Sequence, residues 1–193
     1  MKIIGITGSI GCGKTYLAKI LNNLGYSVYN PDLWVKKLYK KNDFLAVIKQ
    51  NFPDVFEIDG TFNKRKLRNL VFNDNKKLKK LEALIHPFLK SKLKKIINKF
   101  ALDQEFLFLD VALLLEMGWD KYCDYIILAD VEENIQIKRV MQRDNIKEEN
   151  VKKIIALQTD KNIKYDMADY VIDTDLPYGI NKVQLIEFLR EIR

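Results

Sequence analysis

A short segment near the start of the chain has the residue types and spacing of a phosphate-binding loop. Gly8-Ser9-Ile10-Gly11-Cys12-Gly13-Lys14-Thr15 reads as a glycine, four further residues and then Gly-Lys-Thr. The glycines permit backbone angles at which successive N–H groups converge on phosphate oxygens. We expect Lys14 to reach the β- and γ-phosphates and the Thr15 hydroxyl to join the Mg²⁺ shell. The loop and the adjoining Tyr16 therefore predict a site for ATP and Mg²⁺, although the motif alone does not name a reaction.

A carboxylate follows a second apolar run. Residues 106–109 read Phe-Leu-Phe-Leu and lead directly into Asp110, where a metal-binding carboxylate of P-loop proteins usually stands. The alternative is that Asp110 simply ends a strand. The chain contains no Asn-Lys-x-Asp tetrad of the kind that reads guanine, so a GTPase is not favoured.

Asp32 is the candidate general base. A sugar or alcohol hydroxyl is a poor nucleophile, and a carboxylate beside the phosphate loop can orient it and accept its proton. Asp32 comes just after a short apolar run at 27–29, and ligands of open α/β sheets gather at the carboxyl ends of the strands. Its alternative role is an N-cap for a helix that begins near Leu33.

Two arginines could form a lid over the phosphates. Arg139 and Arg143 are four residues apart, on one face of a predicted helix. An arginine that closes over the γ-phosphate would stabilise the charge that moves in the transition state and exclude water. The alternative is that Arg143 pairs with a helix carboxylate such as Asp144 or Glu148. We favour Arg143 as the phosphate contact, followed by Arg139.

The elements that must position these residues follow a β-α-β pattern. Apolar runs predict strands at 2–7, 27–29, 105–111, 124–130 and 170–172, and helical spacing predicts helices at 14–24, ended by Gly25, and at 181–192. Lysine-rich helical patterns fill 33–100, and a charged helical stretch covers 132–164. This alternation predicts an α/β fold in which a parallel sheet is flanked by helices.

Composition limits the class of protein. The chain has 193 residues, 48% of them hydrophobic and 31% charged, which indicates one globular domain with a core. Its apolar runs are too short to span a bilayer. Two cysteines and no signal-peptide pattern favour a cytoplasmic location. The net charge of +7 fits a polyanionic partner, but we favour the explanation that it comes from solvated lysine-rich helix faces.

Along nearly its whole length, the chain resembles the dephospho-CoA kinase family. The resemblance is carried by elements in the family's order and with similar spacing: the Thr7–Thr15 loop, the Asn30-Pro31-Asp32 corner, Leu67, Arg68 and Val71, His86-Pro87, Ala112–Glu116, Gln136–Asp144, Gln158 and Ala168–Asp173. It implies a P-loop kinase fold with a helical insertion and a helical lid. It also implies transfer of the ATP γ-phosphoryl group to the ribose 3′-hydroxyl of dephospho-CoA.

The resemblance further implies roles for residues outside the loop. It places the acceptor against Arg68, His86, Leu113, Leu114 and Glu116, with His86 more plausible as a structural residue, and it places adenine near Ile172 and Asp173. The implied organisation is one kinase domain, 1–193. Its core is 1–32, 101–131 and 166–193, its acceptor-binding insertion is 33–100 and its lid is 132–165.

Several positions depart from the family's pattern. Asn30 replaces an aspartate and Pro31 an alanine; Ala112 replaces a proline and Thr174 an asparagine, which leaves the adenine contacts open. Cys12 replaces a serine in the loop. A thiol at a helix N-terminus can have a lowered pKa, so we hypothesise that oxidation of Cys12 inhibits the protein.

Two other functions remain open from sequence. Another P-loop small-molecule kinase, such as a nucleoside monophosphate kinase, would share the loop and lid but lack the His-Pro and Leu-Leu-x-Glu elements. A basic nucleic-acid-binding ATPase is favoured only by the charge. We expect dephospho-CoA as the partner, no nucleic-acid or membrane partner, and a monomer or weak homo-oligomer.

Overall fold

Five parallel strands form one sheet within the part of the chain that the structure describes, which is residues 1–72, 74–100, 104–116 and 118–193 of this computed structural model. The strands are β1 (Lys2–Thr7), β2 (Val28–Tyr29), β3 (Phe106–Asp110), β4 (Tyr125–Asp130) and β5 (Tyr170–Asp173). Their order across the sheet is β2-β3-β1-β4-β5. The predicted parallel α/β sheet is confirmed, with each strand within a residue or two of its expected position.

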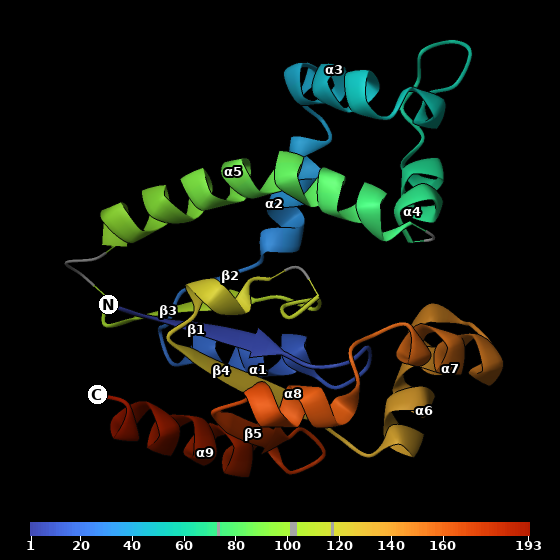
Figure 1. Cartoon of the computed structure of the whole chain (residues 1–193). Coiled ribbons are helices and arrows are strands. Elements are labelled where there is room, and N and C mark those ends of the chain that lie inside the picture. The colour runs from blue at the N-terminus through green and yellow to red at the C-terminus, as the bar shows by residue number, and fades with distance from the viewer. Residues whose placement is uncertain (73, 101–103, 117) are drawn as a thin grey trace. The chain divides into compact units, whose positions relative to one another are not determined.

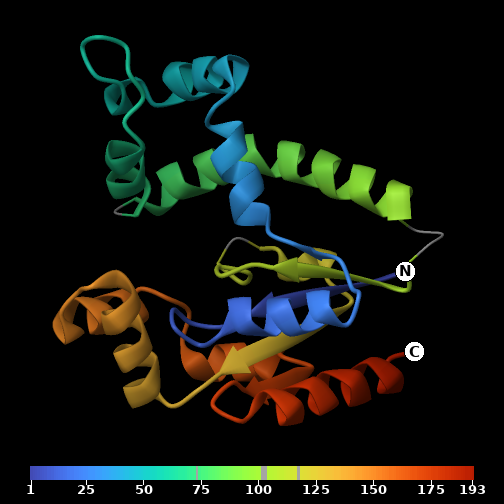
Figure 2. The same ribbon diagram turned by 180° about the vertical axis from the view of Figure 1, so that it is seen from behind.

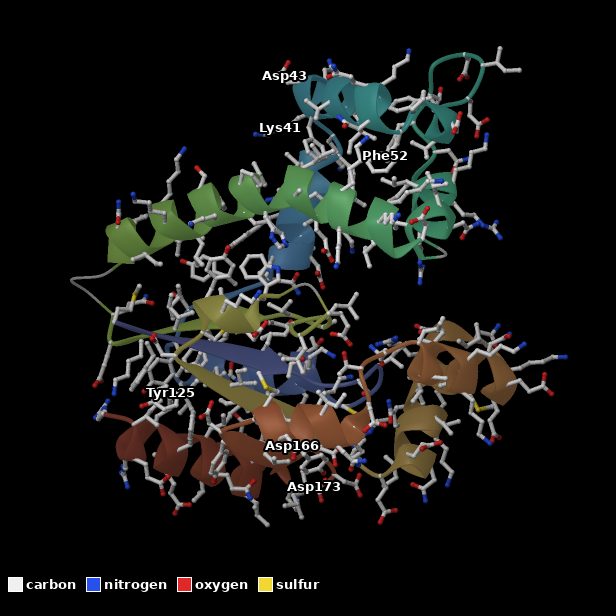
Figure 3. All side chains as sticks on the ribbon, in the orientation of Figure 1. Lys41, Asp43, Phe52, Tyr125, Asp166 and Asp173 are labelled. Carbon is white, nitrogen blue, oxygen red and sulfur yellow. The ribbon has the colours of Figure 1, made fainter. Side chains whose placement is uncertain are left out.

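The central strand β1 is hydrogen-bonded on both sides. Its register pairs Ile6 with Asp110 of β3 and with Ile127 of β4. Because all five strands are parallel, their carboxyl ends meet at one edge of the sheet, which is where ligands of such sheets bind. Figure 3 labels Tyr125, the first residue of β4, and Asp173, the last residue of β5.

Helices cover both faces of this sheet (Figures 1 and 2). Helices α1 (Lys14–Asn23) and α9 (Tyr178–Glu191) pack on one face, and α8 (Lys161–Met167) contacts β4. Ile4 and Ile6 lie in the same fully buried cluster as Leu17 of α1 and Leu185 of α9. Alternation along β1 points Gly5 the other way, toward the segment after β3. Apolar side chains on both faces explain why the strands read as continuous hydrophobic runs.

The stretch expected as a charged helical lid consists of three helices. They are α6 (Glu133–Asp144), α7 (Glu148–Ala156) and α8. Helix α6 ends at Asn145, whose φ of 51° is left-handed, and Ile137, Val140 and Val151 form a small apolar cluster between α6 and α7. Helices α6 and α7 thus share a small apolar core of their own, whereas α8 contacts β4.

Residues 31–99 form a second compact unit, separate from the unit made by 1–30 and 100–193. Its helices are α2 (Pro31–Leu38), α3 (Asn42–Asn51), η1 (Pro53–Val55), α4 (Lys64–Phe72) and α5 (Asn75–Phe100). Pro53 ends α3, and Phe56 and Phe62 pair in an isolated antiparallel bridge. The helical character expected for 33–100 is therefore confirmed. The expected return to the core at residue 101 falls outside the described residues.

A loop and one short 3₁₀ helix lead from β3 to β4 in the unit that contains the sheet. After β3 the chain turns through residues 111–116 and 118–119 into η2 (Asp120–Tyr122), which precedes β4. Among the described residues, no helix has both the length and the apolar character needed to cross a bilayer.

Candidate nucleotide-binding site

The glycine loop connects β1 to α1 at the carboxyl edge of the sheet. Two of its glycines are required by close contacts as well as by backbone angles. Gly8 has φ 147°, and a Cβ there would lie 2.3 Å from the carbonyl oxygen of Ala129. Gly13 has φ 83°, and a Cβ there would lie 2.7 Å from the Thr174 hydroxyl. The loop is thus wedged between β4 and the residue that follows β5, a position only glycine tolerates.

The N-terminus of α1 faces the loop. Gly13 is its N-cap in a left-handed conformation, and glycine has no side chain with which to cap the first N–H groups. Such a helix end binds anions through its N–H groups and its positive dipole end. Lys14 Nζ donates to the carbonyl of Gly8 at 2.6 Å and to that of Ser9 at 3.3 Å, and Thr15 is exposed. The loop therefore has the geometry of an anion site.

The remaining loop residues are held by the lid helices and by the core. The Ile10 N–H donates to Gln158 Oε1 at 2.9 Å, and Gln136 Nε2 donates to the Ile10 carbonyl. Tyr16 packs edge-on against Tyr178, with ring centroids 6.3 Å apart. Gln136 of α6 and Gln158 of the connection between α7 and α8 thus hold one loop residue, so residues 133–160 are tied directly to the phosphate loop.

Cys12 is buried, which corrects our hypothesis about its reactivity. Its side chain is 2% exposed and belongs to the core cluster. Burial raises the pKa of the thiol, and the nearby Asp130 adds to this, while Lys14 opposes it more weakly. Desolvation of the thiolate therefore outweighs the helix N-terminus. The idea that Cys12 is a redox-sensitive thiol is not supported.

Asp110 ends β3 beside the loop. Its side chain is 9% exposed, Asn30 Nδ2 donates to its Oδ2 at 3.2 Å, and the Lys14 charge acts on it. Burial raises the pKa of Asp110, and Lys14 and Asn30 only partly offset that rise. A buried carboxylate with incomplete compensation is a favourable ligand for a cation. Asn30, which replaces the family's first aspartate, thus keeps a contact at this edge.

The two lid arginines have different partners. Arg139 donates to the Thr174 hydroxyl at 3.0 Å and to the Thr174 carbonyl at 3.2 Å, and it forms an ion pair with Asp175. Arg143 forms a two-pronged ion pair with its neighbour Asp144, at 2.8 and 2.7 Å, and is largely exposed. This is the alternative named for Arg143 from sequence. Of the two arginines, Arg139 is the one held against a residue that touches the loop.

The end of β5 places three successive residues differently. Ile172 is fully buried in the main cluster, and Asp173 is exposed and accepts a hydrogen bond from the Asp175 N–H. Thr174 is 5% exposed, and its hydroxyl lies 3.0 Å from the Cys12 carbonyl. Of the two residues predicted near adenine, Ile172 therefore packs in the core and Asp173 is exposed. The contact with the phosphate loop is made by the next residue, Thr174.

The segment after β3 contributes Leu113, Leu114 and Glu116. Leu114 is fully buried, and a Cβ on Gly5 would lie 2.5 Å from its Cδ1, so Leu114 packs on the central strand. Leu113 is half-buried. Glu116 Oε1 accepts from the Thr159 N–H at 2.8 Å and lies 3.9 Å from Lys164 Nζ. Sequence reasoning did not single out Lys164, which is 1% exposed.

Three predicted site residues lie in the second unit. Asp32 is in the first turn of α2, which begins at Pro31, so Asp32 is inside the helix rather than its N-cap. Arg68 is exposed on α4. His86 lies on α5, and its Nε2 is buried with no hydrogen-bond partner among the residues that the structure describes.

A parallel sheet whose central strand leads through a Gly-Lys-Thr loop into a helix, with a carboxylate at the end of the neighbouring strand, defines a P-loop nucleotide-binding protein. The family model described as dephospho-CoA kinase matches residues 2–177. The chain belongs to the dephospho-CoA kinase family.

Curated relatives agree with this family. The dephospho-CoA kinase of Bartonella henselae is 41% identical over 193 residues, which are 100% of this chain and 98% of the relative. That of Pseudoalteromonas translucida is 34% identical over 95% of this chain and 88% of the relative. The match to the Bartonella henselae relative therefore covers both the sheet and the second unit.

Solved structures share the fold. The crystal structure of TT1252 from Thermus thermophilus has a TM-score of 0.87 at 28% identity and covers 100% of this chain and 98% of its own. A shikimate kinase from Acinetobacter baumannii in complex with shikimate has a TM-score of 0.54 at 12% identity, covering 99% of this chain and 94% of its own. The second likeness concerns the fold alone.

Proposed function

We propose that this chain transfers the γ-phosphoryl group of ATP to the ribose 3′-hydroxyl of dephospho-CoA, the reaction that completes coenzyme A. The observation that carries the proposal is the glycine loop at the carboxyl edge of the sheet in a chain of the dephospho-CoA kinase family. Phosphoryl transfer needs little covalent help from the protein, so its residues act by positioning and by electrostatic stabilisation.

The loop holds the nucleotide. Backbone N–H groups at Gly11–Gly13 and at the start of α1 bind the phosphate oxygens. The Lys14 ammonium stabilises the negative charge that develops on the bridging oxygen during transfer. Lys14 donates to two carbonyls of the same loop, Gly8 and Ser9, so its ammonium is already placed at the loop surface. Exchanging carbonyls for phosphate oxygens gives it charge-assisted bonds, which are stronger.

Asp32 is the proposed base. The chain at Asn30 is anchored to the sheet edge by its hydrogen bond to Asp110 and by the pairing of Tyr29 with Leu109. Consecutive Cα atoms are about 3.8 Å apart, so the backbone at Asp32 lies within roughly 8 Å of that anchor. A carboxylate at this position in the chain could orient the acceptor hydroxyl and accept its proton.

Arg139 is our preferred lid contact, with Arg143 as a second cation farther along α6. Arg139 is held beside Thr174, which touches Cys12 and Gly13 of the loop. A guanidinium at that place can bind a phosphate oxygen with two parallel N–H groups. Arg143 donates its hydrogen bonds to Asp144, so it would have to break that ion pair to reach a phosphate. Because the pair is exposed, breaking it costs little free energy.

Mg²⁺ fits the oxygen ligands that this edge offers. Thr15 supplies an exposed hydroxyl and Asp110 a buried carboxylate whose pKa is raised by burial, so a cation there would stabilise its ionised form. No group of three or more Asp, Glu, His or Cys side chains that could cage a metal occurs among the described residues. Mg²⁺ in kinases is held by few carboxylates together with phosphates and water, which agrees with this sparse set. When bound, the ion would neutralise part of the negative charge of the ATP phosphates.

The acceptor-binding residues are proposed for each unit by itself, from the family resemblance. In the second unit Arg68 offers a guanidinium suited to phosphates, and in the unit that contains the sheet the candidates are Leu113 and Glu116, in the segment after β3. His86 and Leu114 are assigned structural roles, because Leu114 is fully buried on β1 and His86 stands before the helix-internal Pro87.

The test is a coupled assay for ADP release with dephospho-CoA, AMP, adenosine or single-stranded DNA as the acceptor or effector, run with Mg²⁺-ATP. We expect turnover with dephospho-CoA alone, and a Lys14→Met variant should lose it by at least about 100-fold. Turnover with AMP instead would identify a nucleoside monophosphate kinase. ATP hydrolysis stimulated by DNA would identify a nucleic-acid-dependent ATPase.

A further inference from the structure

A buried lysine with no role in the reaction as described above lies behind the phosphate loop. Lys164 is 1% exposed, on a helix of seven residues whose neighbouring side chains Ile163 and Met167 are exposed. Lysine is almost never fully buried unless its charge is paired. An apolar side chain would fill the same space without the cost of removing an ammonium from water, so the charge needs an explanation.

The ammonium joins two segments that are far apart in sequence. Lys164 Nζ donates to the Ser9 hydroxyl of the phosphate loop at 3.0 Å. On its other side it lies 3.9 Å from Oε1 of Glu116, in the segment after β3. Burial lowers the pKa of Lys164, whereas the carboxylate of Glu116 acts in the opposite direction and favours the charged form. The lysine therefore depends on these partners to remain an ammonium.

Glu116 is itself held in place. Its Oε1 accepts from the Thr159 N–H at 2.8 Å, and its Oε2 is buried without a hydrogen-bond partner among the described residues. Gln158, the residue before Thr159, binds the N–H of Ile10 at 2.9 Å. The connection between α7 and α8 thus contacts the phosphate loop through Gln158 and the segment after β3 through Thr159, and Lys164 spans the same two segments one turn farther on.

We propose that Lys164 is a positioning residue that sets the phosphate loop and the segment carrying Glu116 in their relative places. The proposal rests on the function proposed above, in which the loop holds the donor and the Glu116 segment approaches the acceptor. Lys164 acts through Ser9 and Glu116, and it needs no contact with the reacting atoms. Phosphoryl transfer depends on the in-line approach of an acceptor oxygen, and a misplacement of about 1 Å can cost roughly 100-fold in rate.

Other lysines of this region do not share the arrangement. Lys161, on the same helix, is more than half exposed and pairs with Asp130 at 2.9 Å. Lys14 donates to carbonyls of the loop itself and is assigned to the phosphates. Lys164 alone among these three is removed from water and faces both segments.

The experiment measures ADP released and CoA formed in the same reaction, for the parent chain, Lys164→Met and Lys19→Met. Methionine keeps the length of the lysine stem, and Lys19 lies exposed on α1, so Lys19→Met is a matched control. Lys164→Met should form CoA roughly 100-fold more slowly than the parent and release more than one ADP per CoA, because water replaces the misaligned acceptor. A protein that is merely less well folded loses both products in proportion.

A double variant tests the link itself. If Lys164 acts through Ser9, Ser9→Ala should slow the parent but add less than about twofold to Lys164→Met. A ratio of one ADP per CoA with a rate within threefold of the control overturns the proposal. If Lys164→Met does not fold, Ser9→Ala and Glu116→Gln decide, and a ratio of one in both overturns it. A parent chain that forms no CoA counts against the proposed function instead.

Discussion

Arg139 on the lid and Thr174 after the last strand are joined by two hydrogen bonds, one to the Thr174 hydroxyl at 3.0 Å and one to its carbonyl at 3.2 Å. The same hydroxyl lies 3.0 Å from the Cys12 carbonyl of the phosphate loop. Threonine stands here where the family's pattern has asparagine. The replacement therefore keeps a hydrogen-bonding side chain at a point where α6, the phosphate loop and the end of β5 meet.

Replacing Thr174 by valine removes this junction at nearly constant volume. The partly exposed Arg139 guanidinium and the carbonyls of Cys12 and Asp130 each lose a partner, which should lower the free energy of unfolding by about 1–3 kcal/mol. Arg139 should also be less well placed for the phosphates, so we expect KM for ATP to rise roughly 3- to 10-fold. Thermal unfolding and initial-rate kinetics check both, and Thr174→Ser, which keeps the hydroxyl, should stay close to the parent in each.

Asp32→Asn tests the proposed base. Asparagine can hold a hydroxyl but cannot take its proton, so kcat with dephospho-CoA should fall by about 100- to 10,000-fold. Binding of ATP, measured by titration calorimetry with a non-hydrolysable analogue, should change little. Asp43, which lies in the first turn of α3, provides the matched control Asp43→Asn. A rate near that of the parent would remove Asp32 from the role.

Asp110→Asn should raise the melting temperature at neutral pH while it lowers the activity at limiting Mg²⁺. Burial raises the pKa of Asp110 above its value of about 4 in the unfolded chain, so the folded protein holds this proton more tightly. The contribution of Asp110 to the free energy of unfolding is therefore most favourable at low pH and falls as the pH rises from the unfolded pKa to the raised folded pKa. Above that window the asparagine variant should melt at a higher temperature than the parent.

The two melting temperatures should converge below pH 4, where both side chains are neutral. Activity should move in the opposite direction, because the variant loses a ligand for Mg²⁺ and needs more of the ion for half-maximal rate. Melting curves from about pH 3 to 8 and Mg²⁺ titrations of the rate provide the two measurements. A variant that is less stable at pH 7 would show that the buried charge is fully compensated.

The cysteines should be inert in the folded protein. Burial raises the pKa of Cys12, and that of Cys123 to about 12, so neither forms much thiolate near neutral pH. A disulfide-exchange reagent at pH 8 should label neither thiol within the time needed to label both in guanidinium chloride. Peroxide should inactivate the parent and Cys12→Ser at the same rate. Rapid labelling of Cys12 in the native chain would reinstate the redox hypothesis.

Local signals in the sequence predicted most of the sheet. Residues 2–7 form β1 as predicted, and Gly25, with φ 89°, follows α1 as its predicted stop. Both signals are local, because a buried strand and a helix end are determined by neighbouring residues. The boundaries inside 33–100 and 132–164 were less visible, since lysine-rich helical spacing continues across the breaks. Pro53 is the exception, a breaker that the sequence displays and the structure uses.

Long-range polar partners could not be predicted in the same way. Lys164 belongs to a short helix in which Ile163 and Met167 are exposed and the lysine is buried, the reverse of an amphipathic pattern. Its burial follows from Ser9 and Glu116, which are distant in sequence. Likewise, the helix N-terminus suggested an acidic Cys12, but the packing that buries the thiol comes from other elements. Burial of this kind is a property of the whole core.

The order of the strands has a consequence for how the protein forms during synthesis. Strand β1 emerges from the ribosome before β3 and β4, yet Lys2 pairs with Phe106 and Thr7 with Leu128, so the hydrogen-bonding partners of β1 are made only after about a hundred further residues. Contacts so distant in sequence close slowly. The apolar Ile-Ile-Gly-Ile stretch therefore stays unpaired while the intervening residues are made, and the sheet that supports the phosphate loop is completed only after β3 and β4 have been synthesised.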